Sequence, residues 1–329
     1  EVARRIVAVS DVVVESFSYS VLERFGLTYE ELRRVRPDLI MASCSGFGRS
    51  GPFKSLRAFM NTVTGVTGLT ALNGYPGGKP RPLGGTWADY VAGTALTMAV
   101  LVALYHRRRV GRGMYIDLSM AEASMAVMGK SFMEYFTCGR VPERRGNRDD
   151  VACPHNVYPT QGADRWIAIA CETQEQWLAL CHEMGNPPWC QEPCFADPLS
   201  RLQLQDEVDR AVGEWTCQFS EPHELARRLQ QAGVPAAVVA NARDLANDPN
   251  LQARGFLETP NHLEIGRRTI AGLPFTLAGQ AERPCPPAPL LGEHNNDVVV
   301  ELLGLPQEMA DSLNRMVQRA VKEAQTVPH

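Results

Sequence analysis

A carboxylate and two glycines mark the segment of the chain with the clearest chemical potential, Gly84-Gly85-Thr86-Trp87-Ala88-Asp89-Tyr90. Asp89 stands where this loop passes into an apolar segment, residues 90–107, which we expect to be a helix. A carboxylate at a helix start faces the positive end of the helix dipole and unpaired backbone N–H groups, which favour its ionised form. The glycines permit close approach of a ligand or another backbone. Such a carboxylate could act as a nucleophile, or it could simply cap its helix.

The composition of the chain argues against some classes of partner. The 329 residues are 44% hydrophobic and 21% charged, which is typical of a globular protein and long enough for two domains. The formal net charge of −4 argues against a nucleic-acid-binding protein. The longest apolar stretch, near residues 95–105, is shorter than the roughly 18 residues of a membrane span. We therefore expect a buried core helix there and no membrane partner.

The cysteines indicate neither a metal site nor a disulfide framework. The nine cysteines are scattered, and no His–Cys set has the spacing of a zinc site, so we expect no metal. Most of the thiols should be buried as small apolar side chains in a reducing cytoplasm.

The start of the chain raises a question of completeness. The chain opens with Glu1 rather than Met, and its first expected strand, residues 12–14, has the apolar character of a parallel strand buried on both faces. Nothing upstream supplies neighbours for that strand. We therefore expect either that an N-terminal segment is missing or that later strands complete the sheet.

Helical and strand patterns alternate in the first part of the chain. Expected strands at residues 12–14, 39–45 and 114–119 are separated by helical segments, which predicts an α/β domain with a mainly parallel sheet. The glycine-rich run Gly46-Phe-Gly-Arg-Ser-Gly51 follows the second strand, at the edge where open α/β sheets bind ligands. Its spacing is not that of a dinucleotide fingerprint.

A charged segment, residues 140–150, marks the end of this first domain. We expect a large domain over residues 1–149 and a small α+β domain over residues 150–245. The remainder, residues 246–329, should be a linker and a C-terminal return to the large domain.

Six groups of motifs follow one another along nearly the whole chain. They are Asp11-Val-Val-Val-Glu-Ser-Phe17, Arg36-Pro-Asp-Leu-Ile40 with Ser45-Gly-Phe-Gly-Arg-Ser-Gly-Pro52, the Asp89 helix, Gly111-Arg-Gly113 with Tyr115-Ile-Asp-Leu-Ser119, Gly272-Leu-Pro-Phe275 and Ala288-Pro-Leu-Leu-Gly-Glu-His294. In this order and spacing, the chain resembles the class III CoA-transferase family, the formyl-CoA-transferase-like or CaiB/BaiF group. The resemblance implies a Rossmann-like large domain, whose opening strand–helix–strand this chain lacks, and an interlocked homodimer.

The resemblance also implies a reaction. Members of the family move CoA from an acyl-CoA donor, such as succinyl-CoA, to a free carboxylic acid. The family's nucleophilic aspartate falls on Asp89, which would form an aspartyl anhydride and then an aspartyl-CoA thioester. Coenzyme A takes part as the acyl-CoA substrate. The site must stabilise oxyanions and exclude water, a task that suits the backbone of Gly84 and Gly85.

Two arginines and one loop match CoA-binding positions of the family. Arg24 and Arg57 fall where the family has basic residues near the CoA phosphates, although each could be an ordinary surface arginine. Gly46, Phe47 and Gly48 match the loop that lines the pantetheine arm, and Phe47 could equally belong to the core.

One CoA-binding segment departs from the family pattern. Ser16 and Phe17 match a segment that helps to hold CoA, but Ser16 replaces an asparagine, and the proline and glycine that start the next helix are absent. The CoA contacts of this segment are therefore expected to differ.

Two other functions stay open from the sequence. Related α-methylacyl-CoA racemases have a histidine near the position of Met60, and a methionine cannot move protons, which disfavours a racemase or isomerase. A non-catalytic subunit of a heteromeric CoA-transferase is the second alternative, since some relatives with a His-Asn-Val-Tyr sequence are halves of two-subunit enzymes. In this chain that sequence begins at His155, which either binds an acceptor carboxylate or oxyanion, or is hydrogen-bonded at a domain junction.

Overall fold

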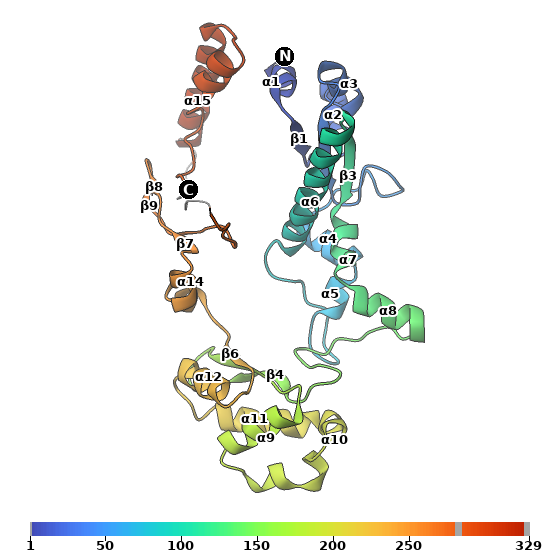
Figure 1. Ribbon diagram of the computed structural model, residues 1–329, viewed down its shortest axis with the longest axis vertical. Coiled ribbons are helices and arrows are strands. Elements are labelled where there is room, and N and C mark those ends of the chain that lie inside the picture. Colours follow the sequence, from blue (N-terminus) through green and yellow to red (C-terminus); the bar gives the residue numbers. More distant parts are fainter. Residues whose placement is uncertain (1, 280–284, 326–329) are drawn as a thin grey trace. The chain divides into compact units, whose positions relative to one another are not determined.

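The computed structural model describes residues 2–279 and 285–325, which belong to two compact units. The larger unit is Val7–Val239, and the other combines described residues of Glu1–Ile6 and Ala240–His329. The larger unit contains a parallel sheet in its first part and an antiparallel sheet in its second (Figure 1). The division at residues 149 and 245 stays a prediction.

Three parallel strands form the centre of the first part. They are β1 (Val12–Glu15), β2 (Ile40–Ser45) and β3 (Tyr115–Ser119), with β2 in the middle. The first four residues of β2 are buried, because β2 is the central strand and helices pack against the sheet there. This confirms the predicted α/β architecture with a parallel sheet.

Short helices pack against this sheet. Val7, at the end of α1 (Val2–Val9), forms a buried cluster with Leu32, Leu39 and Met41. Leu32 belongs to α3 (Tyr29–Val35), which begins with a capping box between Thr28 and Glu31, and α2 (Val21–Phe25) precedes it.

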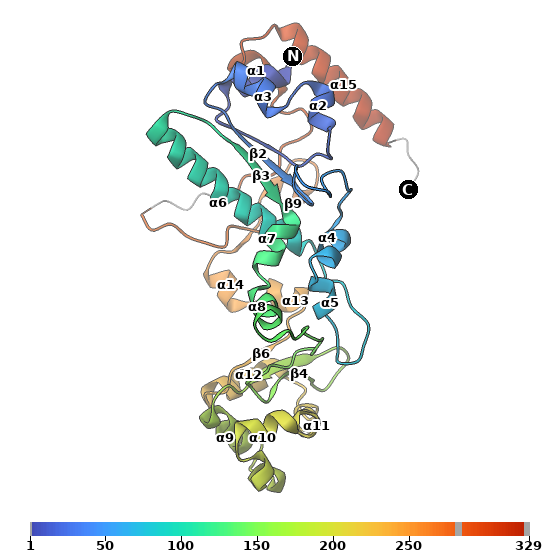
Figure 2. The same cartoon turned by 90° about the vertical axis from the view of Figure 1, so that its right-hand side faces the viewer.

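The helix that carries Asp89, α6 (Trp87–Val110), runs beside the sheet (Figure 2). It contacts β2 and β3 as well as α7 (Met120–Ala126). Gly111, in the left-handed region at φ 69°, ends the helix.

The exposure of α6 contradicts two predictions. Among its apolar residues between 95 and 105, Met98, Leu101, Val102 and Tyr105 are exposed and only Leu96 and Ala103 are buried, so the predicted buried core helix is wrong for the chain taken alone. By length and composition α6 could cross a membrane, since an 18-residue window has a mean hydropathy of 1.5 and is 22% buried. The prediction that no stretch reaches this length is therefore also wrong, because the small and weakly polar residues before position 95 extend the apolar helix.

The C-terminal end of α6 is tied to the amino-terminal edge of the sheet. Arg107 donates to the carboxylate of Asp11 at 2.8 Å and to the carbonyl oxygens of Asp11 and Asp38. Arg36 shares the Asp11 carboxylate at 2.8 Å and, by a hydrogen bond at 3.1 Å, lowers the pKa of Asp38. Because Asp11 and Asp38 precede β1 and β2, the opposite end of α6 points toward the carboxyl edge of the sheet.

Other helices of the first part differ from the predictions. The small apolar residues of 61–72 predict a single helix, but the structure divides it into α4 (Met60–Val66) and α5 (Leu69–Leu72), because Gly68 adopts φ 87°, outside the helical region. The helix α8 (Gly129–Cys138) was not expected.

The second part of the larger unit, which we call the small lobe, has a continuous apolar core. Its antiparallel sheet has the order β4 (His155–Pro159), β5 (Trp166–Ala170) and β6 (Ala236–Val238). The helices are α9 (Gln174–Glu183), α10 (Pro198–Gln203), α11 (Gln205–Thr216) and α12 (Pro222–Gln231). Trp177, Leu180 and Leu229 lie in its core and are at most 1% exposed.

The other unit consists of short elements and a long helix. It contains α13 (Ala242–Ala246), α14 (Pro249–Ala253), the strand pairs β7 (Leu257–Glu258) with β10 (Ile270–Ala271) and β8 (Asn261–His262) with β9 (Gly266–Arg267), a π-helix (Asp297–Leu302) and α15 (Gln307–Gln325). The sequence pattern predicts a helical tail over residues 295–303 and 306–323, which the last two elements confirm.

The cysteines do not behave as expected from the sequence. All nine are free, and only Cys153, Cys171, Cys181 and Cys190 are buried. The expectation that most would be buried is wrong, since four others are exposed and Cys44 is intermediate.

Candidate active site

Asp89 is the third residue of α6, and its side chain is exposed. Its backbone N–H donates to the carbonyl of Thr86 at 3.1 Å, and Thr86 occupies the cap position without a side-chain cap bond. Among the described residues, no hydrogen bond or ion pair engages the Asp89 carboxylate. The Asp89 carboxylate is therefore accessible to a ligand and does not cap the helix.

The two glycines before Asp89 leave room beside it. Gly84 and Gly85 are exposed, and a Cβ built on either would meet no described atom within 4 Å. Gly85 has φ 71°, a conformation that disfavours other residues. The open backbone suits the predicted approach of a substrate.

The carboxylate of Asp89 lies near the carboxyl end of β2. Burial raises the pKa of the Cys44 thiol on that strand, and the charges of Asp89 and Glu15 raise it further. Ala88, next to Asp89, is fully buried in a cluster with Val63 and Ala121, against which Phe47 and Met60 pack. The structure thus brings the glycine loop and the start of α6 together.

Steric constraints explain the first glycines of the loop. A Cβ on Gly46 would lie 2.0 Å from the Cβ of Ala58, far inside contact distance. The carbonyl of Gly46 accepts a hydrogen bond from the N–H of Ala121 at 3.0 Å, and Gly48 is buried with φ 81°. Phe47, between them, therefore has little freedom to move away from Ala88.

Ser16 and Phe17 follow directly after β1 and are exposed, Phe17 by 55%. The N–H of Phe17 donates to the carboxylate of Glu15 at 2.9 Å, and its carbonyl accepts from Arg49 at 2.8 Å. This segment and the glycine loop thus meet at Arg49.

The two arginines expected at the CoA phosphates are accessible. Arg24 on α2 and Arg57 in the loop before α4 are both exposed. In the part of the chain that the structure describes, neither guanidinium has an acidic partner. Both charges are therefore available to an anionic ligand.

His155 is in a different setting. It is the first residue of β4, and its Nδ1 lies 2.7 Å from the carbonyl oxygen of Asn147. This contact ties the ring to the segment that joins α8 to the small lobe. The structure does not join His155 to Asp89 or to the glycine loop.

Arg49 is the residue at this site that sequence reasoning missed. Its side chain pairs with the buried carboxylate of Glu15, and its N–H donates to Asp117 at 2.8 Å. The available signal was a charged residue inside a glycine loop, together with an acidic residue at the end of an apolar strand.

Two cavities of the larger unit have linings that do not include Asp89. One, of about 300 Å³, is lined by Glu15, Ser43, Arg49 and Tyr115 among others. Inside it, the Tyr115 hydroxyl donates to the Ser43 hydroxyl at 2.9 Å, and burial raises the pKa of Tyr115.

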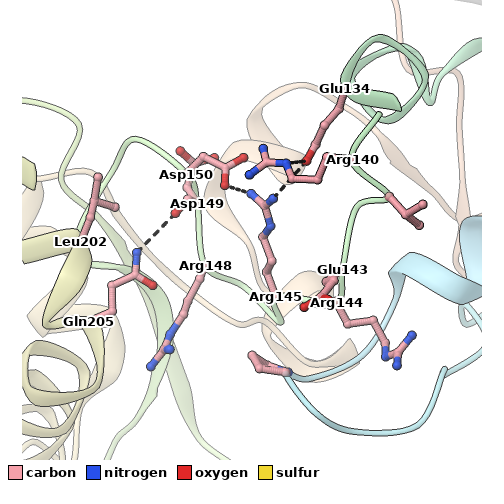
Figure 3. A pocket seen from close by; sticks show the side chains of 12 residues that line it. Glu134, Arg140, Glu143, Arg144, Arg145, Arg148, Asp149, Asp150, Leu202 and Gln205 are labelled. Atoms are coloured by element: carbon pink, nitrogen blue, oxygen red, sulfur yellow. Dashed lines mark hydrogen bonds and ion pairs between the residues drawn. The ribbon is translucent and has the colours of Figure 1, made fainter. Parts of the chain in front are cut away.

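The second cavity, of about 480 Å³, lies along residues 140–150 (Figure 3). Arg140 and Arg145 point toward Glu134, and Arg145 also pairs with Asp150. Arg148 pairs with Asp206 at 2.5 Å and with Asp209 at 2.8 Å. Because acidic side chains match most of the arginines, this cavity has little surplus positive charge for an anion.

No group of three or more His, Cys, Asp or Glu side chains within residues 2–279 and 285–325 is placed to hold a metal ion. The expectation of no metal stays a prediction.

The comparisons with known proteins agree with the resemblance seen in the motifs. Residues 1–295 match the family model described as CoA-transferase family III. The succinyl-CoA–D-citramalate CoA-transferase of Chloroflexus aurantiacus is 30% identical over 93% of this chain and 75% of its own length. The succinyl-CoA–L-malate CoA-transferase beta subunit of the same organism is 31% identical over 95% of this chain and 77% of its own.

A solved structure shows the same fold. The crystal structure of a CAIB/BAIF family protein from Brucella suis superposes with a TM-score of 0.83 at 28% identity, and covers 92% of this chain and 78% of that chain. Its fold is the mixed α/β fold described above. The chain therefore belongs to CoA-transferase family III, a family of enzymes that transfer CoA between acyl-CoA and carboxylic acids.

Proposed function

We propose that this protein transfers CoA from an acyl-CoA donor, such as succinyl-CoA, to a free carboxylic acid through covalent intermediates on Asp89. The observation that carries this proposal is the accessible carboxylate of Asp89, which pairs with no described residue and lies between two open glycines and the glycine loop. The names of the two Chloroflexus relatives, both of which specify succinyl-CoA, support the choice of donor.

In the first half of the proposed reaction, a carboxylate oxygen of Asp89 attacks the carbonyl carbon of the donor thioester. The C–S bond breaks, and CoA leaves as a thiolate, which produces a mixed anhydride between Asp89 and the donor acyl group. The thiolate then attacks the Asp89 carbonyl of this anhydride. The donor acid leaves as its carboxylate, and Asp89 is left as a thioester of CoA.

The second half repeats these steps in reverse with a new acid. The acceptor carboxylate attacks the Asp89 thioester, and the thiolate leaves again. It then attacks the acceptor carbonyl of the second anhydride, which forms the new acyl-CoA and frees the Asp89 carboxylate. No net proton or electron is transferred, so the reaction needs neither a redox cofactor nor a general acid.

The demands on the site are therefore electrostatic. Each carbonyl addition places negative charge on an oxygen, and backbone N–H groups near Gly84 and Gly85 are suited to donate to it. Water must be kept from the anhydrides, because hydrolysis would waste the donor. Arg24 and Arg57, exposed and without acidic partners among the described residues, are the proposed contacts of the CoA phosphates.

The acceptor should be identified with a panel of acids. Purified protein would be incubated with succinyl-CoA and free acids that include malate, citramalate and monocarboxylates, and new acyl-CoA esters would be detected by mass spectrometry. Hydroxylamine added during turnover should trap Asp89 as a hydroxamate. If neither new esters nor a modified Asp89 form, the proposal is wrong, and exchange of the α-hydrogen of an acyl-CoA in deuterated water would instead identify a racemase.

We also propose a homodimer, because the exposed apolar face of α6 needs a cover. Met98, Leu101 and Tyr105 are each more than half exposed, and apolar patches of this kind mark interfaces. Sedimentation of the purified protein at micromolar concentration should give twice the mass of the chain. A monomer, or a protein that sediments only with added vesicles, would contradict the dimer.

A further inference from the structure

We propose that Arg49 and Glu15 are positioning residues for acyl-CoA binding, because they fix the glycine loop and residues 16–17 against each other. The inference rests on the proposed CoA transfer, since it concerns the loop beside Asp89. Neither side chain is assigned a contact with the substrate.

The first observation is a three-way contact at one nitrogen of Arg49. Its Nη2 lies 2.7 Å from Oε1 and 2.6 Å from Oε2 of Glu15, and it donates to the carbonyl oxygen of Phe17 at 2.8 Å. The N–H of Phe17 donates in turn to Oε2 of Glu15. The exposed segment 16–17 is therefore held on both of its backbone polar groups at Phe17.

The second observation is that the backbone of Arg49 is held independently. Its N–H lies 2.8 Å and 3.0 Å from the two carboxylate oxygens of Asp117, on β3. Glu15 ends β1, and the loop itself follows β2, so all three strands of the sheet contribute to its position. Phe47, two residues before Arg49, packs against the cluster that contains Ala88.

The third observation is that the two side chains of the ion pair are largely buried beside an open cavity. The cavity of about 300 Å³ that Glu15 and Arg49 line lies directly beside them. The side chains of Glu15 and Arg49 are only 3% and 14% exposed, so an unpaired charge there would be poorly solvated. Loss of either partner should therefore cause the remaining charged side chain to move, and the loop with it.

Loss of the ion pair should weaken binding of the acyl-CoA donor and leave the rate of the chemical steps nearly unchanged. Residues 16–17 and 46–48 lie on either side of the ion pair, and both match CoA-binding segments. Asp89 is positioned separately, by α6. Disorder in the loop should thus raise the KM for acyl-CoA, while kcat and the KM for the acceptor acid change little.

The test compares Arg49→Gln with Arg49→Lys and with a matched control, Arg33→Gln. Arg33 forms an exposed ion pair with Glu30 at 3.5 Å on α3 and makes no hydrogen bond to the described residues 15–17 or 46–51. Arg49→Gln should raise the KM for succinyl-CoA about tenfold and lower kcat less than about threefold. Arg49→Lys, which retains a charge for Glu15, should recover part of the loss, and Arg33→Gln should behave as wild type.

A second measurement does not depend on turnover. Hydrogen exchange should become faster in peptides that contain Phe17 and Arg49 in the Arg49→Gln and Glu15→Gln variants, and calorimetry should show weaker binding of free CoA. Unchanged exchange, a fall in kcat with an unchanged KM, or an equal effect of Arg33→Gln would overturn the proposal. If wild-type protein transfers no CoA, the proposed reaction fails, and the exchange and calorimetry then decide the positioning role by themselves.

Discussion

The two parts of the larger unit are held together by different means. In the small lobe, Trp177, Leu180 and Leu229 belong to one continuous apolar core. Around the parallel sheet, the buried clusters are smaller, and polar contacts such as Glu15–Arg49 and Asp11–Arg107 connect the elements. The comparison teaches that stability and chemistry are separated in this protein: the small lobe depends on burial, whereas the region around Asp89 depends on directed polar contacts and open space.

The largest effect on activity should come from Asp89→Ala. Removal of the nucleophile should lower CoA-transfer activity at least about 10³-fold. Because the side chain is exposed and no described residue bonds to it, the free energy of unfolding should change by no more than about 0.5 kcal/mol. Activity would be followed by mass spectrometry and stability by urea unfolding. A fall in the free energy of unfolding well beyond this value would contradict the separation of stability from chemistry.

The converse result is expected for Leu180→Ala in the core of the small lobe. Leu180 is 0% exposed, and its truncation should lower the free energy of unfolding by about 3 kcal/mol through lost burial and a cavity. Leu178→Ala is the matched control, because Leu178 lies on the same helix and is 57% exposed. Urea unfolding of both variants decides the matter, and equal losses would mean that the apolar core is not the source of stability.

Gly46→Ala tests how tightly the glycine loop is placed. The new Cβ would lie 2.0 Å from the Cβ of Ala58, so the loop must shift, at a cost of about 1–3 kcal/mol and with weaker CoA binding. Gly65→Ala on α4 is the control, since a Cβ at that residue would meet no described atom within 4 Å and its effect should be small. Calorimetric titration with CoA should separate the two. Equal binding by both variants would show that the loop tolerates displacement.

The smallest effect concerns alkaline pH in the small lobe. Burial raises the pKa of the thiols of Cys153 and Cys171 to about 12. An unfolded thiol loses its proton near pH 8.5–9, so above this pH the folded state binds more protons, and stability falls as pH rises toward 12. The loss should reach about 1.5 kcal/mol per thiol by pH 10.

Urea unfolding at pH 8 and pH 10 would measure this loss. A variant with both cysteines replaced by Ala should lose less stability over the interval than wild type. Replacement of Cys138, which is exposed, should leave the slope unchanged. A wild-type stability that does not fall with pH would refute the raised pKa values.

The sequence predicted the elements whose signals are local. The apolar run of β2 and the start of α6 after the glycines each depend on residues close in the chain. The division between α4 and α5 was missed, because the positive φ of Gly68 follows from tertiary structure and a glycine in an apolar helix does not require it.

The residues of the candidate site also fall into those with a local sequence signal and those that depend on tertiary structure. Asp89 and its glycines could be found from the helix start, and the family motifs identified the loop at residues 46–48. The Glu15–Arg49 pair could not be found, because its partners are 34 residues apart and meet only when β1 and β2 lie side by side. The exposure of Leu101 and Tyr105 was also unpredictable, because the apolar pattern of a helix does not distinguish an exposed apolar face from a buried one.

The anchoring of α6 by Arg107 has a mechanical consequence. Asp89 and Arg107 are 18 residues apart on one continuous helix, which corresponds to about 27 Å. Because α6 is one continuous rigid helix, a small tilt at its C-terminal end displaces the Asp89 carboxylate at its N-terminal end. Substitutions at Arg107 or Asp11 would therefore adjust the position of the Asp89 carboxylate, the proposed nucleophile, without altering any group that surrounds it.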